Sequence, residues 1–251
     1  MNSSISIIYS TADQASVNIR DALLSNGMDR ALFHELDTRL IHSDFPEKKL
    51  ELNGGALIFL SRHSSEKKVN SLTVHPVGNF STAELGGNYG EVAPCDPWVQ
   101  SAILRSIKES YVGNKYQITF EATHHGPRSE SRIMFAEIGT GPENWEDSEA
   151  LGALAAGIRR FKQEDYPNYI AAGGGHYAPK FTDAAMEMKV NIGHIISKYR
   201  MDDMVANGLQ LAFDSTPECK GFILDRKGLR SGHLEAIRKF CSEKELDMIE
   251  L

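Results

Sequence analysis

The strongest constraint on the fold is the alternation, along the whole chain, of short apolar runs with segments of helical period. Residues 5–9 are β-branched and aromatic and predict a strand. Asp13 and the three residues before it supply N-cap chemistry for a helix that ends near Gly27. The apolar run 56–60 predicts a strand buried on both faces. This strand–helix–strand start predicts an α/β fold with parallel strand pairs covered by helices.

Similar patterns follow further along the chain. They predict strands over 31–36, 116–120, 133–138, 169–172 and 222–225, and helices over 98–110, 145–161 and 228–244. Residues 61–95 are polar and rich in glycine and proline, with one short apolar stretch at 72–74. They predict a long loop region that is functional or mobile. No break in composition marks a boundary, so we expect one three-layer domain over residues 1–251.

Composition and charge restrict the class of protein. The chain has no signal-peptide pattern and no apolar run long enough for a membrane span, so we expect a soluble protein. Its three cysteines, Cys95, Cys219 and Cys241, are widely spaced, which fits a reducing cytoplasm. The net charge of −7 counts against nucleic-acid binding by the whole surface. A nucleic-acid substrate would require basic side chains gathered on one face.

Six of the nine histidines fall where predicted strands meet loops, and these are His63, His75, His124, His125, His176 and His194. His34, His42 and His233 are interpreted as surface or packing residues instead. In open α/β sheets, ligands bind in the crevice beyond the carboxyl ends of strands. Histidines delivered there by separate strands can converge on one site.

The most informative segment is the pair His124-His125, which follows a strand and precedes Gly126-Pro127. Neutral imidazole is a common zinc ligand and transfers protons near neutral pH. Adjacent strand residues point to opposite faces, so both histidines serve one site only if the backbone leaves strand geometry there. Glu137, an acid between apolar residues, is either a solvated strand residue or a metal ligand or partner of a histidine.

A second segment, Gly173-Gly174-Gly175-His176, follows a predicted strand. Glycines allow main-chain N–H groups to approach a phosphate or a developing oxyanion, which predicts this role for Gly174 and Gly175. The segment lacks the patterns of ATP- and NAD-binding loops, and the chain contains neither a serine-hydrolase elbow nor an HExxH motif. For hydrolysis there remains water activated by a metal or positioned by a histidine.

With these segments in place, the sequence resembles the archaeal- and plant-type D-aminoacyl-tRNA deacylases. The resemblance extends over most of the chain. It is carried by Ile8-Tyr9-Ser10-Thr11, Ala15-Ser16-Val17-Asn18-Ile19, Ser61-Arg62-His63, Leu72-Thr73-Val74-His75-Pro76 with Gly78-Asn79, Glu121-Ala122-Thr123-His124-His125-Gly126-Pro127, Glu137-Ile138-Gly139 with Trp145, and Gly173-Gly174-Gly175-His176-Tyr177-Ala178-Pro179. Residues 81–96 match no pattern of the family.

The resemblance implies hydrolysis of the ester between a D-amino acid and the tRNA 3′ ribose by a cytoplasmic monomer with two zinc ions. It also implies a three-layer α/β/α fold of the phosphorylase/hydrolase type, with a mixed sheet. From motif position we predict metal binding by His63, His75, His124, His125, Glu137 and His176, and catalysis by His124, His125, His176, Gly174 and Gly175. Arg62, Arg128, Tyr177 and Lys180 are predicted to bind the substrate.

Two other functions are compatible with the residues. One is a zinc-dependent peptidase or amidohydrolase that acts on small substrates without tRNA. The other is a non-catalytic protein that binds nucleic acids or nucleosides, with the histidines in structural roles. The acidic net charge favours a small substrate, whereas the order of the family motifs favours tRNA.

Overall fold

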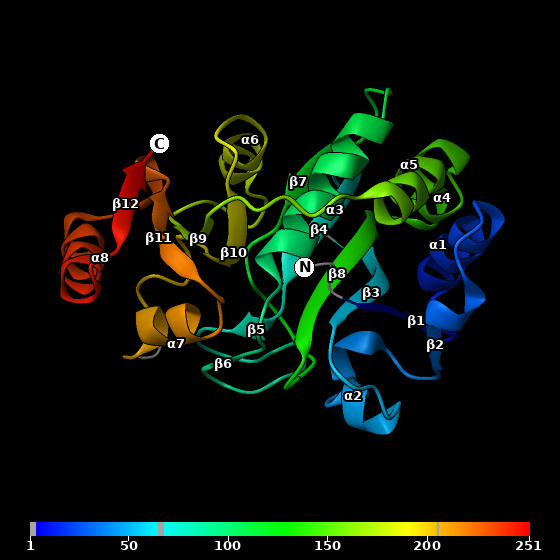
Figure 1. The fold of residues 1–251 in the computed structure, drawn as a ribbon, viewed down its shortest axis with the longest axis horizontal. Coiled ribbons are helices and arrows are strands. Elements are labelled where there is room, and N and C mark those ends of the chain that lie inside the picture. The colour runs from blue at the N-terminus through cyan, green and yellow to red at the C-terminus, as the bar shows by residue number, and fades with distance from the viewer. Residues whose placement is uncertain (1–3, 65–67, 205) are drawn as a thin grey trace.

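The N-terminal strand–helix–strand unit is present in the computed structural model, which describes residues 4–64, 68–204 and 206–251. Strand β1 (Ile5–Ser10) leads into helix α1 (Gln14–Ser25), and β1 pairs in parallel with β2 (Phe33–Leu36) and β3 (Ala56–His63) (Figure 1). The Asp13 carboxylate caps α1 by accepting the N–H of Ala15 at 3.1 Å, as predicted. The predicted strand over 31–36 begins later, because the 3-10 turn η1 (Arg30–Leu32) precedes it.

Six strands form a mixed sheet in the order β2-β1-β3-β8-β4-β7. Strand β8 (Arg132–Gly139) is parallel to β3, and β4 (Ser71–Pro76) is antiparallel to β8 and parallel to β7 (Gln117–Phe120). The α/β class and the mixed sheet flanked by helices are therefore confirmed. The prediction of a loop over 61–95 was wrong for β4, whose six residues are all buried between β8 and β7.

The two faces of this sheet are covered differently. One apolar cluster joins one face to α1, α3 (Pro97–Ser110) and α5 (Ser148–Arg160), and Gly157 lets α5 approach α3 closely. A second cluster joins the other face to the segment of η2 (Leu40–His42) and α2 (Pro46–Lys49). Val77 and Ala93 belong to this second cluster, and they flank β5 (Gly78–Asn79) and β6 (Glu91–Val92), which form a small ladder.

A parallel four-stranded sheet lies beside the first in Figure 1, in the order β10-β9-β11-β12. Strands β9 (Asn168–Ala172) and β11 (Cys219–Leu224) and helix α8 (Ser231–Lys244) were predicted from the sequence. The sequence did not predict β10 (Asn191–Ile196), β12 (Asp247–Glu250), α6 (Pro179–Glu187) or α7 (Gly208–Asp214). The short elements α4 (Pro142–Trp145) and η3 (Arg226–Gly228) complete the order.

One apolar cluster contains side chains from both sheets, including Phe120 of β7 and Ile192 of β10. We therefore propose that residues 1–251 form one domain, because dividing the chain between the sheets would expose this cluster. Among the residues that the structure describes, none of the helices is both long enough and apolar enough to span a membrane.

Candidate active site

A row of buried polar side chains crosses the middle of the mixed sheet. Ser61, Glu137, Thr73 and Thr119 are paired in register across β3, β8, β4 and β7, and each is at most 7% exposed. Paired residues share a face of the sheet, and residues two apart along a strand do as well. His63 and His75 therefore lie on the same face as Glu137. This is the face covered by η2 and α2, opposite α1, α3 and α5.

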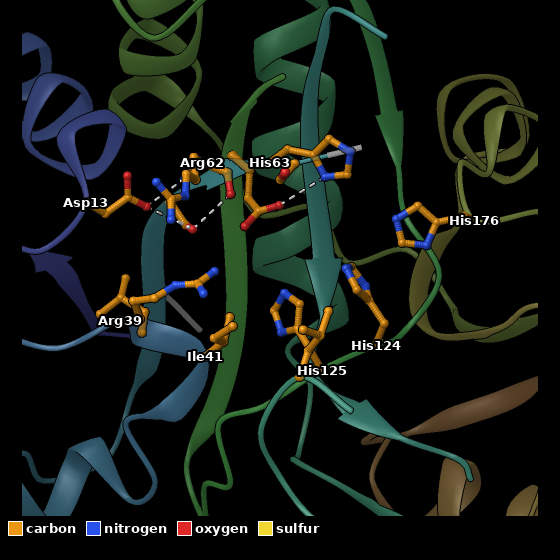
Figure 2. A pocket seen from close by; sticks show the side chains of 13 residues that line it. Asp13, Arg39, Ile41, Arg62, His63, His124, His125 and His176 are labelled. Carbon is orange, nitrogen blue, oxygen red and sulfur yellow. Dashed lines mark hydrogen bonds and ion pairs between the residues drawn. The ribbon is translucent and has the colours of Figure 1, made fainter. Parts of the chain in front are cut away.

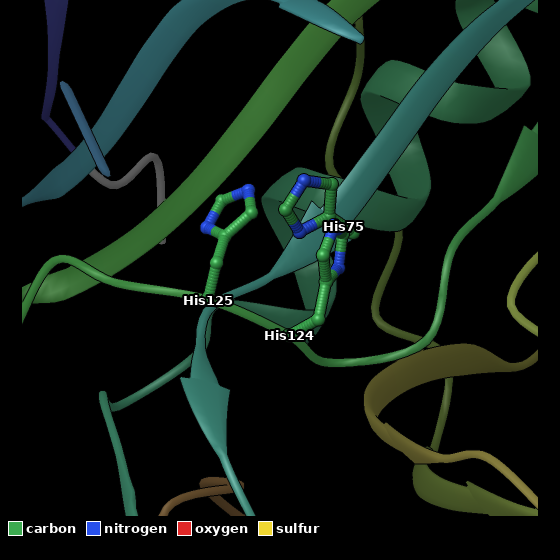
Figure 3. A group of neighbouring side chains, drawn as sticks. All are labelled: His75, His124 and His125. Carbon is green, nitrogen blue, oxygen red and sulfur yellow. The ribbon is translucent and has the colours of Figure 1, made fainter. Parts of the chain in front are cut away.

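The paired histidines reach this face because the chain leaves strand geometry after β7. His125 has φ of 47°, in the left-handed region, and Gly126 follows it against the main chain of Gly87 and Ile41. A Cβ on Gly126 would lie 2.4 Å from the nitrogen of Gly87 and from the oxygen of Ile41, so this packing requires glycine. His124 and His125 both lie beside His75, with ring centroids 4.3 and 4.9 Å from it (Figure 3).

The main chain fixes the tautomers of these three imidazoles. The Nδ1 atoms of His75, His124 and His125 lie 3.0, 2.8 and 2.6 Å from main-chain carbonyl oxygens, to which only an N–H can donate. Each neutral ring therefore keeps a lone pair on Nε2. One nitrogen from each ring lies within 4.8 Å of the others, which makes the three a candidate metal-binding group.

A second candidate group is built around Glu121, which directly follows β7. Its carboxylate lies 3.1 Å from Nδ1 of His63 and 3.1 Å from Nε2 of His176. The hydroxyl of Tyr177 lies 2.7 Å from Nε2 of His63, so both nitrogens of that ring have partners. A bridge between Glu121 and Tyr177 brings the segment after β9 against the end of β7.

Glu137 lies between the two groups. Its carboxylate is 3.5 Å from Nδ1 of His63 and 3.6 Å from Nε2 of His75, and it is almost fully buried. With His75 and Glu121 it forms a third set of candidate ligand atoms. The five histidines predicted to bind metal are thus all brought together, as is Glu137.

Charges within the cluster determine the protonation states. Burial alone would lower the pKa values of His63 and His75, but the nearby carboxylate of Glu137, with charge from Glu121, raises both. Burial raises the pKa of Glu137, and its contacts with the same two histidines outweigh this and hold it well below the ordinary range. Burial and neighbouring imidazoles lower the pKa of His124 well below 6.5 and that of His125 to about 4.

The cluster contains donors that suit a metal ion. The Nε2 atom of His75 lies 3.6 Å from Glu137, and the carboxylate of Glu121 lies 3.1 Å from His63 and from His176. All three atoms are buried, and among the described residues none of them forms a hydrogen bond of suitable geometry. A buried carboxylate and imidazole lone pairs in this state are costly unless they bind a cation. Imidazole nitrogen and carboxylate oxygen are also the ligands that zinc takes in catalytic sites. The residues therefore fit a metal centre.

Two cavities flank the cluster and share Leu85, His124, His125 and His176 in their linings. The first, of about 160 Å³, has a wall on the β3 side that includes Asp13, Arg39, Ile41, Arg62 and His63 (Figure 2). The second, of about 380 Å³, is lined on its far side by Gly78, Asn79, Phe80, Thr82, Glu84, Ala122, Thr123, Ser197, Tyr199 and Arg200. Leu85, which is 54% exposed, belongs to the segment 81–96 that matched no motif.

Two of the four predicted substrate-binding residues lie at the cluster or its cavities, and two do not. Arg62 lines the first cavity, and Tyr177 contacts His63. Arg128 and Lys180 line neither cavity and instead form ion pairs of 2.9 Å with Glu91 and 2.6 Å with Asp225. A contribution of these two to substrate binding remains a prediction.

The glycines after β9 also lie apart from the two cavities. Gly174 and Gly175 are absent from both linings, and a Cβ on Gly174 would meet the ring of Phe181 at 2.9 Å. This proximity gives Gly174 a packing reason for lacking a side chain. Their role as oxyanion donors stays a prediction.

Sequence reasoning missed Glu121 and Arg39. The signal for Glu121 was present, because it continues the alternation of Thr119 with buried Phe120 and so points to the same face as the buried polar row. Arg39 gave no such signal. It lies at the first cavity because the segment that leads into η2 packs on this face of the sheet.

Comparison with known proteins gives consistent matches. Residues 51–249 match the model of a family described as D-aminoacyl-tRNA deacylase. The D-aminoacyl-tRNA deacylase of Thermoplasma acidophilum is 40% identical, over 98% of this chain and 99% of its own. That of Picrophilus torridus is 42% identical, over 80% and 79%. The crystal structure of a conserved protein of unknown function superposes with a TM-score of 0.91 at 27% identity, covering 100% of this chain and 96% of that one.

Proposed function

The chain belongs to the D-aminoacyl-tRNA deacylase family, and we propose that its buried histidine–carboxylate cluster is where the ester of D-aminoacyl-tRNA is hydrolysed. The enzyme is a hydrolase that releases a free D-amino acid and tRNA. The observation that carries the proposal is the convergence of five imidazoles and two carboxylates between two cavities.

We propose zinc as the cofactor, with two ions per chain. His75, His124 and His125 would hold one ion through Nε2, and His63, Glu121 and His176 would hold the other. When bound, zinc polarises an ester carbonyl and lowers the pKa of water to ~7. The low pKa values of His124 and His125 favour this role, since both rings are neutral and their lone pairs are free at physiological pH.

The chain's own residues handle the proton and the orientation of the cluster. Glu137 lies between the two candidate groups and lines the first cavity, so it is placed to accept the proton of the attacking water. The same proton can then pass to the 3′ oxygen of the leaving ribose. Tyr177 orients His63 through its hydroxyl, and the main-chain carbonyls orient His75, His124 and His125.

The proposal extends to location and assembly. Aminoacyl-tRNA is made and used in the cytoplasm, which supports a cytoplasmic enzyme. Three unpaired cysteines, two of them buried, agree with a reducing compartment. We propose that the enzyme is a monomer, as the family resemblance implies.

The decisive experiment is deacylation of matched D- and L-tyrosyl-tRNA by the purified protein. We expect release of D-tyrosine and negligible release of L-tyrosine. Equal rates on both substrates, or no release, would refute the proposed function. Release of amino acids from small esters or peptides without tRNA would favour the peptidase or amidohydrolase alternative.

A further inference from the structure

Two arginines on one wall of the first cavity have no ionic partner in the described structure. Arg39 precedes η2, and Arg62 lies one residue before the end of β3. Neither guanidinium forms a hydrogen bond or ion pair with any residue that the structure describes. The guanidinium of Arg62 lies over the ring of Trp145, with its Cζ atom 5.4 Å from the ring centroid. In Figure 2 both arginines are on the Asp13 side of the cavity, across from His176.

Other arginines near the cluster are neutralised. Arg200, which lines the second cavity, is 3.1 Å from the carboxylate of Asp203. Arg128 is 2.9 Å from Glu91, and Arg132 is 2.9 Å from Asp96. Among the described arginines that line either cavity, Arg39 and Arg62 therefore lack an ion pair, whereas Arg200 has one.

The carboxylate on that wall does not neutralise them. One oxygen of Asp13 accepts the N–H of Ala15 and the other accepts the main-chain N–H of Arg62, at 3.1 Å each. Its charge is placed at the N-terminus of α1, which already favours a negative group. This end of the cavity therefore keeps a net positive charge that suits an anion.

From this arrangement we propose that Arg39 and Arg62 together bind a backbone phosphate at the 3′ end of the tRNA. The inference rests on the proposed function and assigns one end of the same site. Guanidinium groups are always charged and match phosphate oxygens in a planar fork. The phosphate of the terminal nucleotide is the anionic group of tRNA closest to the ester that is cleaved. Its binding would orient the ester toward the histidines.

The test compares two small substrates that differ by one phosphate, namely 3′-O-D-tyrosyl-adenosine and its 5′-phosphate. The variants are Arg39→Gln and Arg62→Gln. Arg30→Gln is the matched control, because exposed Arg30 lies in η1 and lines neither cavity. We expect each test variant to lower kcat/KM by roughly 10- to 100-fold on the phosphorylated ester. On the unphosphorylated ester, the loss in the same variants should be at least 10-fold smaller than on the phosphorylated one.

A second measurement uses the whole tRNA. The dependence of log kcat/KM on log salt concentration should be shallower for Arg39→Gln than for Arg30→Gln, by about 0.7 for one lost contact to single-stranded RNA. Equal losses on both esters, or salt slopes equal to the control, would overturn the phosphate site while leaving the deacylase function intact. A wild-type protein that cleaves no D-tyrosyl substrate at all would overturn both.

Discussion

Burial of His194 should lower the stability of the folded protein in acid, and the size of this effect can be worked out from the structure. The ring is fully buried in β10, near the histidine cluster but outside it. Its Nε2 lies 3.0 Å from the carbonyl oxygen of Ala93 and so carries the hydrogen, and its Nδ1 lies 3.1 Å from the Thr123 hydroxyl. Both nitrogens are satisfied by the neutral ring. Burial lowers the pKa of His194 to about 4.

The direction of the effect follows from the two states. The unfolded chain takes up a proton near pH 6.5, whereas the folded chain resists it until about pH 4. Stability from this residue is therefore fully present above pH 6.5 and is lost as the pH falls toward 4. Each pKa unit is worth about 1.4 kcal/mol, so the full loss is about 3 kcal/mol and the loss at pH 5 is about 2 kcal/mol.

The assay is urea unfolding of wild type and His194→Gln at pH 8 and pH 5, with chelator present so that metal binding does not contribute. The difference in unfolding free energy between the two pH values should be smaller in His194→Gln by about 2 kcal/mol. Phe80→Leu is the control. It alters packing against the same ring, with centroids 6.0 Å apart, and should retain the wild-type difference. An undiminished difference in His194→Gln would refute the reasoning.

Three further predictions concern the cluster. Removing metal with a chelator should abolish deacylation and zinc should restore it, whereas activity unaffected by chelation would point to water positioned by histidine alone. Glu137→Gln should lower kcat by about 10²- to 10⁴-fold while zinc content, measured by atomic emission, stays at the wild-type value; lost zinc would instead make Glu137 a ligand. Gly126→Ala should lower the unfolding free energy by about 1–3 kcal/mol in chemical denaturation, because its Cβ would meet main-chain atoms of Gly87 and Ile41 at 2.4 Å. Unchanged stability in that variant would show that the turn relaxes without cost.

The local sequence pattern predicted most strands of the six-stranded sheet, but it did not predict β10 of the four-stranded sheet. The apolar runs that became β1, β3 and β8 are continuous enough to be recognised without tertiary information. Strand β10 contains Gly193 and His194, which interrupt its apolar pattern. Both are explained by contacts with distant segments: a Cβ on Gly193 would meet Thr216 at 2.5 Å, and His194 bonds to Ala93 and Thr123. Propensity carries no information about such partners.

Convergence of the site depended on strand order, which local pattern does not determine. His63 and His75 are twelve residues apart and belong to β3 and β4, which are separated in the sheet by β8. Only the insertion of β8, with β4 antiparallel to it, places Glu137 between the two histidines. The sequence indicated the histidines and their positions at strand ends, but their distances follow from the order of the strands.

The placement of charged residues by the fold explains how a chain with an acidic net charge can act on tRNA, which is a polyanion. Glu121 and Glu137 contribute to the net charge of −7 but are buried among histidines, where their charges are matched locally. A phosphate in the first cavity would contact Arg39 and Arg62, which have no ionic partner among the described residues. At physiological salt, charges beyond about 8 Å are largely screened. On the proposed phosphate contact, attraction of the tRNA end would be governed by these two guanidinium groups rather than by the net charge of the chain.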